Sequence, residues 1–312
     1  MDAFAVVLDQ PESLSLSRLP LTPPGDADVV VDIDYSGIST GTERLLYQGR
    51  MPPFPGMGYP LVPGYESVGR IVAAGPKLKK RIGETVFVPG ASCFGDVRGL
   101  FGGAASRLVV PAARVVSIDP NLGERGVLLA LAATAYHVIS PTLAAFPELI
   151  VGHGVLGRLL ARIITQSGAT PPVVWETNPV RMDGAEGYTV LHPDADPRRD
   201  YPCICDMSGD HEIVDKLVPR LARGGEIILA GFYDRVSFAF PLAFIKEARF
   251  RISSEFRPED LDEVRRLVQD GKLSLDGLIT HHSEPQKVAD AYRIAFGDPA
   301  CLKMIIDWRA ST

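Results

Sequence analysis

The first third of the chain has short apolar runs that glycine and proline separate. The runs have the length and the β-branched content of strands, and they cover residues 28–35, 67–73, 85–88 and 107–110. Many of the prolines fall within residues 20–64. Short strands between Gly/Pro turns are typical of a small barrel or sandwich. We therefore expect an all-β unit in residues 1–120.

Farther along the chain, strand patterns alternate with helical ones. Strand-like runs cover residues 149–151, 173–175, 203–205 and 226–229, and helical patterns cover residues 126–140, 155–167 and 211–221. Such alternation predicts a parallel sheet with helical crossovers. Two more helices, at 259–269 and 284–295, precede a terminal apolar strand at 304–308. The expected fold class is α/β, with two domains.

Composition narrows the class of protein. The 312 residues include 32 basic and 38 acidic side chains, a net charge of −6, and 46% are hydrophobic. This profile is typical of a globular protein and lacks the basic stripe of a nucleic-acid binder. The N-terminal residues do not form a signal peptide, and no run approaches the roughly 20 apolar residues of a membrane span. Four scattered cysteines do not make a disulfide framework, so we expect a cytoplasmic protein.

The sharpest motif is a glycine loop between the strand at 149–151 and the helix at 155–167. Gly152, Gly154 and Gly157 form G-x-G-x-x-G. The first glycine permits the turn, the second lets backbone approach a pyrophosphate, and the third lets the helix pack on the strand. The helix N-terminus, with Val155 and Leu156, offers N–H groups to the anion. His153 inside the loop is either a phosphate ligand or a surface residue.

An acidic residue ends the next strand. Glu176 stands nineteen residues beyond Gly157, and the nearest following basic residue is Arg181. A carboxylate at this position accepts hydrogen bonds from the adenine-ribose diol and repels a 2′-phosphate. The spacing therefore favours NAD over NADP.

Short segments along the whole chain add a second pattern: Gly37 to Ser39, Pro63 to Gly69, Gly103 to Ser106, Thr134 to His137, Arg223 to Glu226, and Leu302 to Met304. With the glycine loop, they resemble the medium-chain dehydrogenase/reductase superfamily. The resemblance implies a GroES-like β-barrel catalytic domain (1–120), a Rossmann NAD-binding domain with a doubly wound parallel sheet (121–257) and a C-terminal return to the catalytic domain (258–312). It implies that Thr134 contacts the nicotinamide. Met207 and Gly231 follow two Rossmann strands, where the cofactor crevice lies.

The chain departs from the zinc members of that superfamily. Those members have a cysteine where this chain has Ser39, and a histidine where it has Tyr65. Zinc takes thiolate, imidazole or carboxylate ligands, and Glu66 alone cannot hold it. The four-cysteine structural lobe is also missing, since Cys93 is the only cysteine between Glu84 and Gly103. We therefore expect a protein without zinc.

Residues 35–49 and 56–66 carry a closer resemblance. They resemble the 3-hydroxyethyl bacteriochlorophyllide a dehydrogenase family of bacteriochlorophyll biosynthesis, whose length and zinc-free pattern also fit. The resemblance implies oxidation of the C3 1-hydroxyethyl group of a (bacterio)chlorophyllide to acetyl, with NAD⁺ taking the hydride. Composition and periodicity alone support only an NAD-dependent oxidoreductase.

Without a metal, side chains must accept the hydroxyl proton or stabilise the developing alkoxide. The candidates are Ser39, Thr42, Tyr65 and Glu66. A nearby cation would lower the phenol pKa of Tyr65, and burial would raise the pKa of Glu66 towards that of a general base. In the plainer alternatives, Tyr65 fills space, Ser39 is a polar remnant, and Glu66 forms an ion pair with a nearby arginine, Arg70 or Arg44.

A tetrapyrrole is large, flat and apolar, so its pocket should be wide and lined by aromatic residues. The expected wall residues are Phe54, Met57, Tyr59, Phe94, Phe101, Phe232 and Tyr233. Two other functions stay open: a zinc-free quinone or enone reductase, and an NAD(H)-binding protein without turnover. Relatives usually pair through the edge of the Rossmann sheet, so we expect a homodimer.

Overall fold

The computed structural model describes residues 1–53, 55–140, 146–233 and 235–309, and the chain divides into two units. Unit 1 comprises Met1–Ala130 and Leu278–Thr312, and unit 2 comprises Leu131–Gly277. The ranges predicted from the sequence, 1–120, 121–257 and 258–312, have the same order. However, the changeovers lie after residues 130 and 277, so the helix at Pro258–Gln269 belongs to unit 2.

Unit 1 is built on a seven-stranded sheet in the order β16-β17-β3-β5-β6-β9, in which β8 also pairs with β3. Its strands are β3 (Asp28–Ile38), β5 (Ser67–Ala74), β6 (Thr85–Val88), β8 (Arg107–Pro111), β9 (Val116–Ser117), β16 (His281–Ser283) and β17 (Met304–Asp307). The terminal strand β17 pairs antiparallel with β3, and Met304 lies opposite Ile38. The C-terminal segment thus completes a sheet that the first third of the chain begins.

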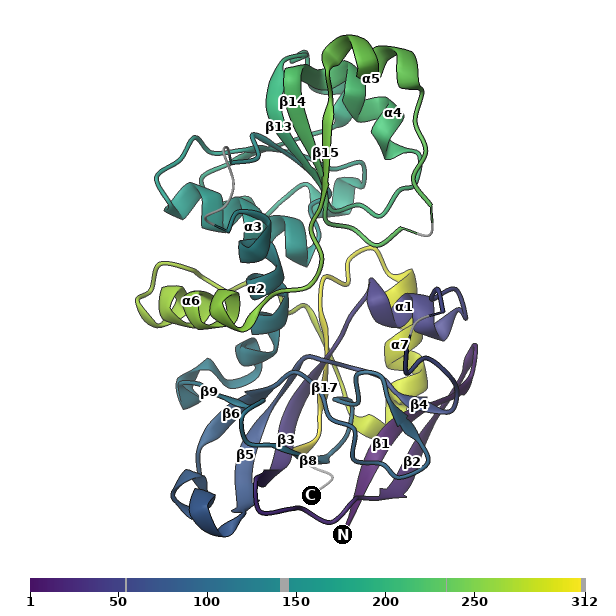
Figure 1. Ribbon diagram of the computed structural model, residues 1–312, viewed down its shortest axis with the longest axis vertical. Coiled ribbons are helices and arrows are strands. Elements are labelled where there is room, and N and C mark those ends of the chain that lie inside the picture. The colour runs from purple at the N-terminus through teal and green to yellow at the C-terminus, as the bar shows by residue number, and fades with distance from the viewer. Residues whose placement is uncertain (54, 141–145, 234, 310–312) are drawn as a thin grey trace. The chain divides into compact units, whose positions relative to one another are not determined.

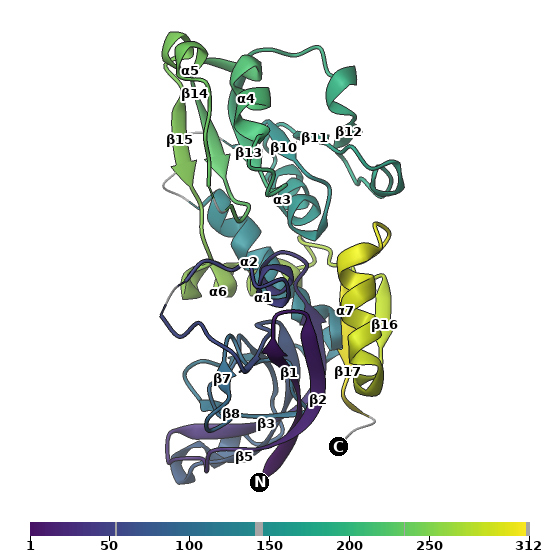
Figure 2. The same cartoon turned by 90° about the vertical axis from the view of Figure 1, so that its right-hand side faces the viewer.

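A four-stranded sheet in the order β2-β1-β4-β7 completes the barrel-like unit. It contains β1 (Asp2–Gln10), β2 (Ser13–Pro20), β4 (Leu61–Val62) and β7 (Arg98–Gly99), and the helical elements of the unit are α1 (Thr42–Tyr47), η1 (Pro76–Arg81), η2 (Pro120–Leu128), η6 (Pro285–Lys287) and α7 (Val288–Gly297). Helix α7 lies beside β16 and β17 (Figure 2). Its Val288, Ala291, Tyr292 and Ala295 join the core with residues of β1, β3 and β8.

Unit 2 has a six-stranded parallel sheet in the order β12-β11-β10-β13-β14-β15, whose strands β13, β14 and β15 are labelled in Figure 1 and all six in Figure 2. The strands are β10 (Leu149–Val151), β11 (Val173–Trp175), β12 (Thr189–Leu191), β13 (Tyr201–Asp206), β14 (Leu221–Leu229) and β15 (Arg249–Ile252). The helical elements are α2 (Leu129–Val138), α3 (Val155–Gln166), η3 (Pro179–Arg181), η4 (Pro193–Ala195), α4 (Ile213–Leu217), η5 (Val218–Arg220), α5 (Phe240–Lys246) and α6 (Pro258–Gln269).

Strand β10 shows why this sheet is covered on both faces. Leu149 and Val151 share a core with α4 and α5 residues, namely Ile213, Val214, Leu217 and Ala243. Ile150 points to the other face, where a Cβ added to Gly157 of α3 would lie 3.7 Å from it. All three strand residues are buried. A continuous apolar strand of this kind is typical of a doubly wound sheet.

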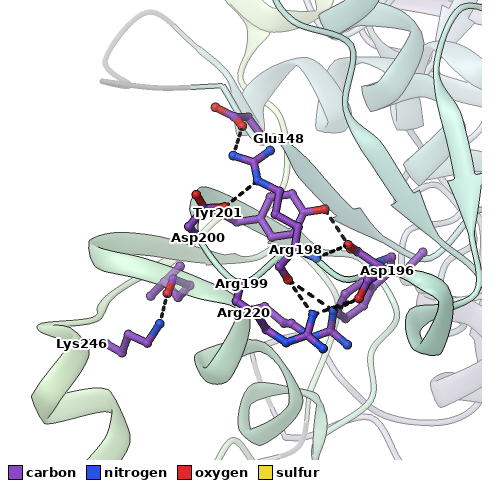
Figure 3. A network of polar contacts seen from close by, with 10 residues as sticks. Glu148, Asp196, Arg198, Arg199, Asp200, Tyr201, Arg220 and Lys246 are labelled. Atoms are coloured by element: carbon purple, nitrogen blue, oxygen red, sulfur yellow. Dashed lines mark hydrogen bonds and ion pairs between the residues drawn. The ribbon is translucent and has the colours of Figure 1, made fainter.

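A polar network fastens the loop before β13 to the sheet (Figure 3). The Asp196 carboxylate is buried and accepts hydrogen bonds from Trp175 Nε1 at 2.7 Å, from the Tyr201 hydroxyl at 2.8 Å and from the Arg198 backbone N–H at 2.8 Å. The Arg220 guanidinium lies over the Trp175 ring, 4.8 Å from its centroid. Because three donors satisfy the buried Asp196 carboxylate, this network is expected to stabilise unit 2.

Two findings concern the environment of the chain. No helix in the described part is both long and apolar enough to cross a bilayer. The four cysteines are buried and free.

Candidate functional site

The glycine loop has the geometry that its sequence predicts. Gly152 has φ +101°, which favours glycine. A Cβ on Gly154 would meet nothing within 4 Å, so a ligand can approach there, whereas a Cβ on Gly157 would lie 1.9 Å from the Gly152 carbonyl oxygen. Val155 and Leu156 begin α3, whose first N–H groups have no partner inside the helix. These residues fit the pyrophosphate of a dinucleotide.

The environment of His153 contradicts both predictions made for this residue. The residue is fully buried, and its ring nitrogens bond the Arg181 carbonyl at 2.6 Å and the Tyr188 hydroxyl at 2.8 Å. Its backbone N–H donates to Glu176 at 3.0 Å. Burial lowers the pKa of the imidazole to about 4, so the ring is neutral at pH 7. His153 is therefore neither an exposed residue nor a phosphate ligand; it holds the loop.

Glu176 directly follows β11 and lies beside the glycine loop, but its carboxylate already accepts hydrogen bonds from the protein. One oxygen accepts the His153 N–H, and the other accepts the N–H groups of Thr177 and Asn178, each at 2.8 Å. A carboxylate offers about four acceptor positions. The carboxylate therefore has room for one hydrogen bond from a ribose diol, not for the two that the sequence predicts.

The predicted residues Met207 and Gly231 follow β13 and β14. The Met207 N–H donates to the Val151 carbonyl at 2.9 Å, and that of Gly231 to Asp206 at 3.2 Å. The buried Asp206 carboxylate accepts the hydroxyl of Tyr233, and burial raises the pKa of both groups. Tyr233 was predicted to line a substrate pocket, but its hydroxyl instead joins the two strand ends of unit 2.

Thr134 and His137 lie in α2, where both are half-buried. His137 Nδ1 bonds the Asp260 carboxylate of α6 at 2.7 Å. Unit 2 thus supplies the glycine loop and the residues around it, while the predicted nicotinamide contact of Thr134 stays a prediction.

In unit 1, strand register brings together residues that are far apart in sequence. Ser39 follows the end of β3, Glu66 precedes β5, and Lys303 precedes β17. Both β5 and β17 pair antiparallel with β3, with Ser36 opposite Ser67 and Ile38 opposite Met304. The C-terminal end of β3 and the N-terminal ends of its two neighbours therefore lie side by side at the same end of the sheet. We call Ser39, Thr42, Glu43, Tyr65, Glu66, Tyr292 and Lys303 the polar cluster.

The hydroxyls of Ser39 and Tyr65 bond each other at 2.7 Å. Ser39 is buried, and Tyr65 and Thr42 are half-buried. Burial, followed by the charge of Glu66, raises the pKa of Tyr65, and hydrogen bonding with Ser39 and Thr42 opposes the rise. The lowered phenol pKa that the sequence analysis considers is therefore wrong, and Tyr65 is protonated at neutral pH.

Glu66 forms an ion pair, but with neither predicted arginine. Its Oε2 lies 2.6 Å from Nζ of Lys303, and both residues are buried. Burial raises the pKa of Glu66, and Lys303 opposes that rise. Within the described residues, the other oxygen, Oε1, has no hydrogen-bond partner. Arg70 and Arg44 instead donate to the backbone carbonyls of Gly83 and Phe296.

Glu43 is the main residue of the cluster that the sequence analysis does not identify. Its Oε1 accepts the Ser39 N–H at 3.0 Å, and its Oε2 accepts the Tyr292 hydroxyl at 2.5 Å. The side chain is 1% exposed, and burial raises its pKa to about 7. The usable signal in the sequence is an acidic residue directly after Thr42; Lys303 gives a similar one, inside an otherwise apolar segment.

The structure brings only part of the predicted pocket wall to this cluster. Phe101 meets Tyr65 edge to face, with ring centroids 5.4 Å apart. Met57 and Tyr59 pack on a separate small core, and Phe94 is a buried core residue, not a wall residue. Phe232 belongs to unit 2, where it is exposed. Phe54 lies outside the described residues.

The donor set does not suit zinc. A serine hydroxyl and a protonated phenol occupy the two positions where zinc relatives have thiolate and imidazole, and the carboxylate of Glu66 is paired with Lys303. Zinc requires thiolate, imidazole or carboxylate ligands, four in most sites. The side chains at these positions therefore do not form a zinc site.

Comparison with known proteins gives close relatives. Residues 25–120 match the alcohol dehydrogenase GroES-like domain. The 2-desacetyl-2-hydroxyethyl bacteriochlorophyllide A dehydrogenase of Rhodobacter capsulatus is 57% identical over 99% of each chain, and that of Cereibacter sphaeroides is 56% identical over 100% of each.

Two solved structures share the fold. A short chain alcohol dehydrogenase from Escherichia coli complexed with NADH has a TM-score of 0.83 at 22% identity, covering 98% of this chain and 99% of that one. A dehydrogenase from Sinorhizobium meliloti bound to NADP has a TM-score of 0.80 at 20% identity, with the same coverage.

Proposed function

Since the chain belongs to the medium-chain dehydrogenase/reductase superfamily, we propose that it oxidises the C3 1-hydroxyethyl group of (bacterio)chlorophyllide a to acetyl, with NAD⁺ as hydride acceptor. The observation that carries the proposal is the identity of 57% over essentially the whole length of a relative named for this substrate. Short conserved motifs are shared across a superfamily, but identity at this level extends to the residues between them.

A nicotinamide cofactor supplies the hydride acceptor when bound. We assign its pyrophosphate to Gly154 and the first turn of α3. NAD is preferred over NADP because the Glu176 carboxylate, although largely used by backbone N–H groups, still places a negative charge where a 2′-phosphate would lie. NADP⁺ should therefore give a much lower kcat/KM than NAD⁺.

The polar cluster of unit 1 handles the proton of the alcohol. The Tyr65 hydroxyl is protonated and coupled to Ser39, so the pair can orient the carbinol oxygen by hydrogen bonding. Glu66 is the proton acceptor in this proposal, because its Oε1 has no hydrogen-bond partner among the described residues and burial raises its pKa. The O–H proton passes to Glu66 while the hydride leaves the carbinol carbon, which leaves a ketone.

The test is to incubate the purified protein with NAD⁺ and hydroxyethyl bacteriochlorophyllide and to record the pigment spectrum. The acetyl product should appear as a red shift together with NADH. Tyr65→Phe should lower kcat/KM by about 10²–10³, the usual range for the loss of one hydrogen-bond donor to a developing oxyanion. Tyr47→Phe, which removes a hydroxyl that donates to the Glu12 carbonyl, is the matched control and should stay active.

Two results would reverse the proposal. Reduction of a quinone or enone with NADPH, without any acetyl product, would favour the reductase alternative. Binding of NAD⁺ without turnover of either substrate would favour a binding protein.

We also propose a homodimer formed through β15, the edge strand of the six-stranded sheet. An unpaired edge invites another strand, and large apolar side chains are exposed on and near this one: Phe240, Phe244, Ile245 and Ile252. An antiparallel copy of β15 would continue the sheet and cover them. In light scattering, Ile252→Lys should give monomers, whereas Val180→Lys, at another exposed apolar residue, should leave the dimer intact; a monomeric wild type would refute the proposal.

The cytoplasmic location expected from the sequence stays a proposal. It is supported by the four free, buried cysteines, since proteins of oxidising compartments tend to form disulfides.

A further inference from the structure

Glu43 links the polar cluster to the C-terminal helix. It is the second residue of α1, and its carboxylate accepts a hydrogen bond from the Ser39 backbone and another from the Tyr292 hydroxyl of α7. Both Glu43 and Tyr292 are 1% exposed. The carboxylate therefore fixes the backbone of the residue whose hydroxyl bonds Tyr65.

Charge at this position is costly. Glu43 forms no ion pair with a described residue, and the buried Lys303 is already paired with Glu66. A glutamine could keep both contacts without a buried charge, because its amide oxygen can accept the Ser39 N–H while its NH2 group donates to the Tyr292 hydroxyl. The fold therefore carries an ionisable group where a neutral one would serve for structure alone, and such groups gather at functional sites.

We propose, building on the function proposed above, that Glu43 is a positioning residue whose negative charge beside Glu66 and Tyr65 makes proton removal from the substrate easier when Glu43 is ionised. The contacts that carry this inference are the two hydrogen bonds of its carboxylate and its place within the cluster.

The charges around Glu43 determine whether the rate of oxidation increases or decreases with pH. The groups that face Glu43 are Tyr292, Ser39, Glu66 and Lys303: burial raises its pKa to about 7, the two hydrogen bonds lower it, Glu66 raises it and Lys303 lowers it. The repulsion between the Glu43 and Glu66 carboxylates is mutual, so ionised Glu43 makes Glu66 a stronger proton acceptor. A negative charge nearby strengthens proton acceptors. Oxidation should therefore speed up as pH rises through about 7.

The first experiment is the pH profile of kcat/KM for oxidation between about pH 5.5 and 9.5, for wild type and two variants. Glu43→Gln can keep both contacts, with its NH2 group donating to the Tyr292 hydroxyl, and it loses the charge. The inflection near 7 should therefore vanish, and kcat/KM at high pH should fall about tenfold, equivalent to one pKa unit. Tyr292→Phe removes a hydrogen bond that lowers the pKa of Glu43, so the inflection should move to higher pH. Glu84→Gln, at an acidic residue bonded to Arg81 and Ser117, is the matched control with an unchanged profile.

The second experiment needs no substrate. Infrared difference spectra of the wild type between pH 6 and 8 should show loss of the C=O band of a protonated carboxylic acid, and Glu43→Gln should lack that change. An unchanged pH inflection in Glu43→Gln, or an infrared change that persists in it, would overturn the inference. If wild type fails to oxidise the pigment while the infrared change is present, the proposed function fails and the titration of Glu43 stands.

Discussion

Replacing Lys303 by methionine tests the buried ion pair of the polar cluster. Methionine keeps the unbranched apolar stem of the side chain, lacks the terminal ammonium group and leaves the Glu66 carboxylate without the cation 2.6 Å away. The Ile38 carbonyl also loses a donor, at 3.2 Å. Removing one partner of a buried pair costs about 3–5 kcal/mol, because the remaining charge has no compensation. With a urea m-value of about 1–3 kcal/mol/M, the midpoint of unit 1 should fall by about 1–5 M.

The two tryptophans make this measurable for one unit at a time. Trp308 lies in unit 1, where its indole N–H donates to Ser36, and Trp175 lies in unit 2. In a Trp175→Phe background, fluorescence reports the unfolding of unit 1 alone. The urea transition of Lys303→Met should be measured in that background at pH 5 and pH 8.

The pH dependence follows from the pKa of Glu66. Burial already raises this pKa, and loss of Lys303 removes the influence that lowers it. The folded variant then binds the proton more tightly than the unfolded chain does, so its stability increases as the pH falls. The loss should therefore be smaller at pH 5 than at pH 8. Adding Glu66→Gln should restore most of the stability at pH 8, and a loss below about 1 kcal/mol, or one that is independent of pH, would refute the argument.

Three further predictions concern unit 2. Gly157→Ala should abolish NADH binding in a fluorescence titration, because the new Cβ would lie 1.9 Å from the Gly152 carbonyl oxygen; binding at wild-type affinity would contradict the geometry. Asp196→Asn should destabilise the unit by about 1–3 kcal/mol in Trp175-monitored unfolding, because a carboxylate that accepts three hydrogen bonds is lost. Because the pKa of Asp196 is lowered in the folded protein, its ionised carboxylate stabilises wild type at neutral pH, and this stabilisation should be lost as the pH falls below 3.8, the ordinary pKa of aspartate. The free energy of unfolding of Asp196→Asn should change less over the same pH range. Arg158→Met should weaken NADH binding, because Arg158 donates to the carbonyls of His153 and of residues 181, 183 and 184, and an unchanged dissociation constant would argue against a role of this loop.

Local patterns predict much of the fold. The strands at residues 85–88, 149–151 and 173–175 begin and end where the apolar runs do. The helix predicted at 211–221 is shorter, because Pro219 cannot donate a hydrogen bond and the α-helix ends at Leu217 before a 3₁₀ turn. No strand is predicted over residues 2–20, although Ser13–Pro20 alternates serine and leucine; serine has little strand preference, and pairing with β1 decides the outcome.

The candidate site likewise contains features that the local sequence predicts and contacts that only the complete fold creates. The glycine loop is local in sequence, so its turn and its close helix contact can be predicted from three glycines. The environment of His153 cannot, because its partners Arg181 and Tyr188 are 28 and 35 residues away. The partner of Glu66 is 237 residues away and is brought there only by the pairing of β17 with β3.

The charges of the polar cluster suggest how side chains serve where zinc relatives use a metal. The cluster holds two carboxylates, Glu43 and Glu66, against one ammonium group, Lys303. With both carboxylates ionised, the buried net charge is −1, and burial opposes it. One proton is therefore held loosely within the cluster near neutral pH, and Glu43 is the group whose pKa lies at about 7. A metal ion strengthens an alcohol as an acid by its positive charge. In the mechanism proposed above, the cluster instead places negative charge beside the group that accepts the proton, which predicts activity that survives chelators and increases with pH.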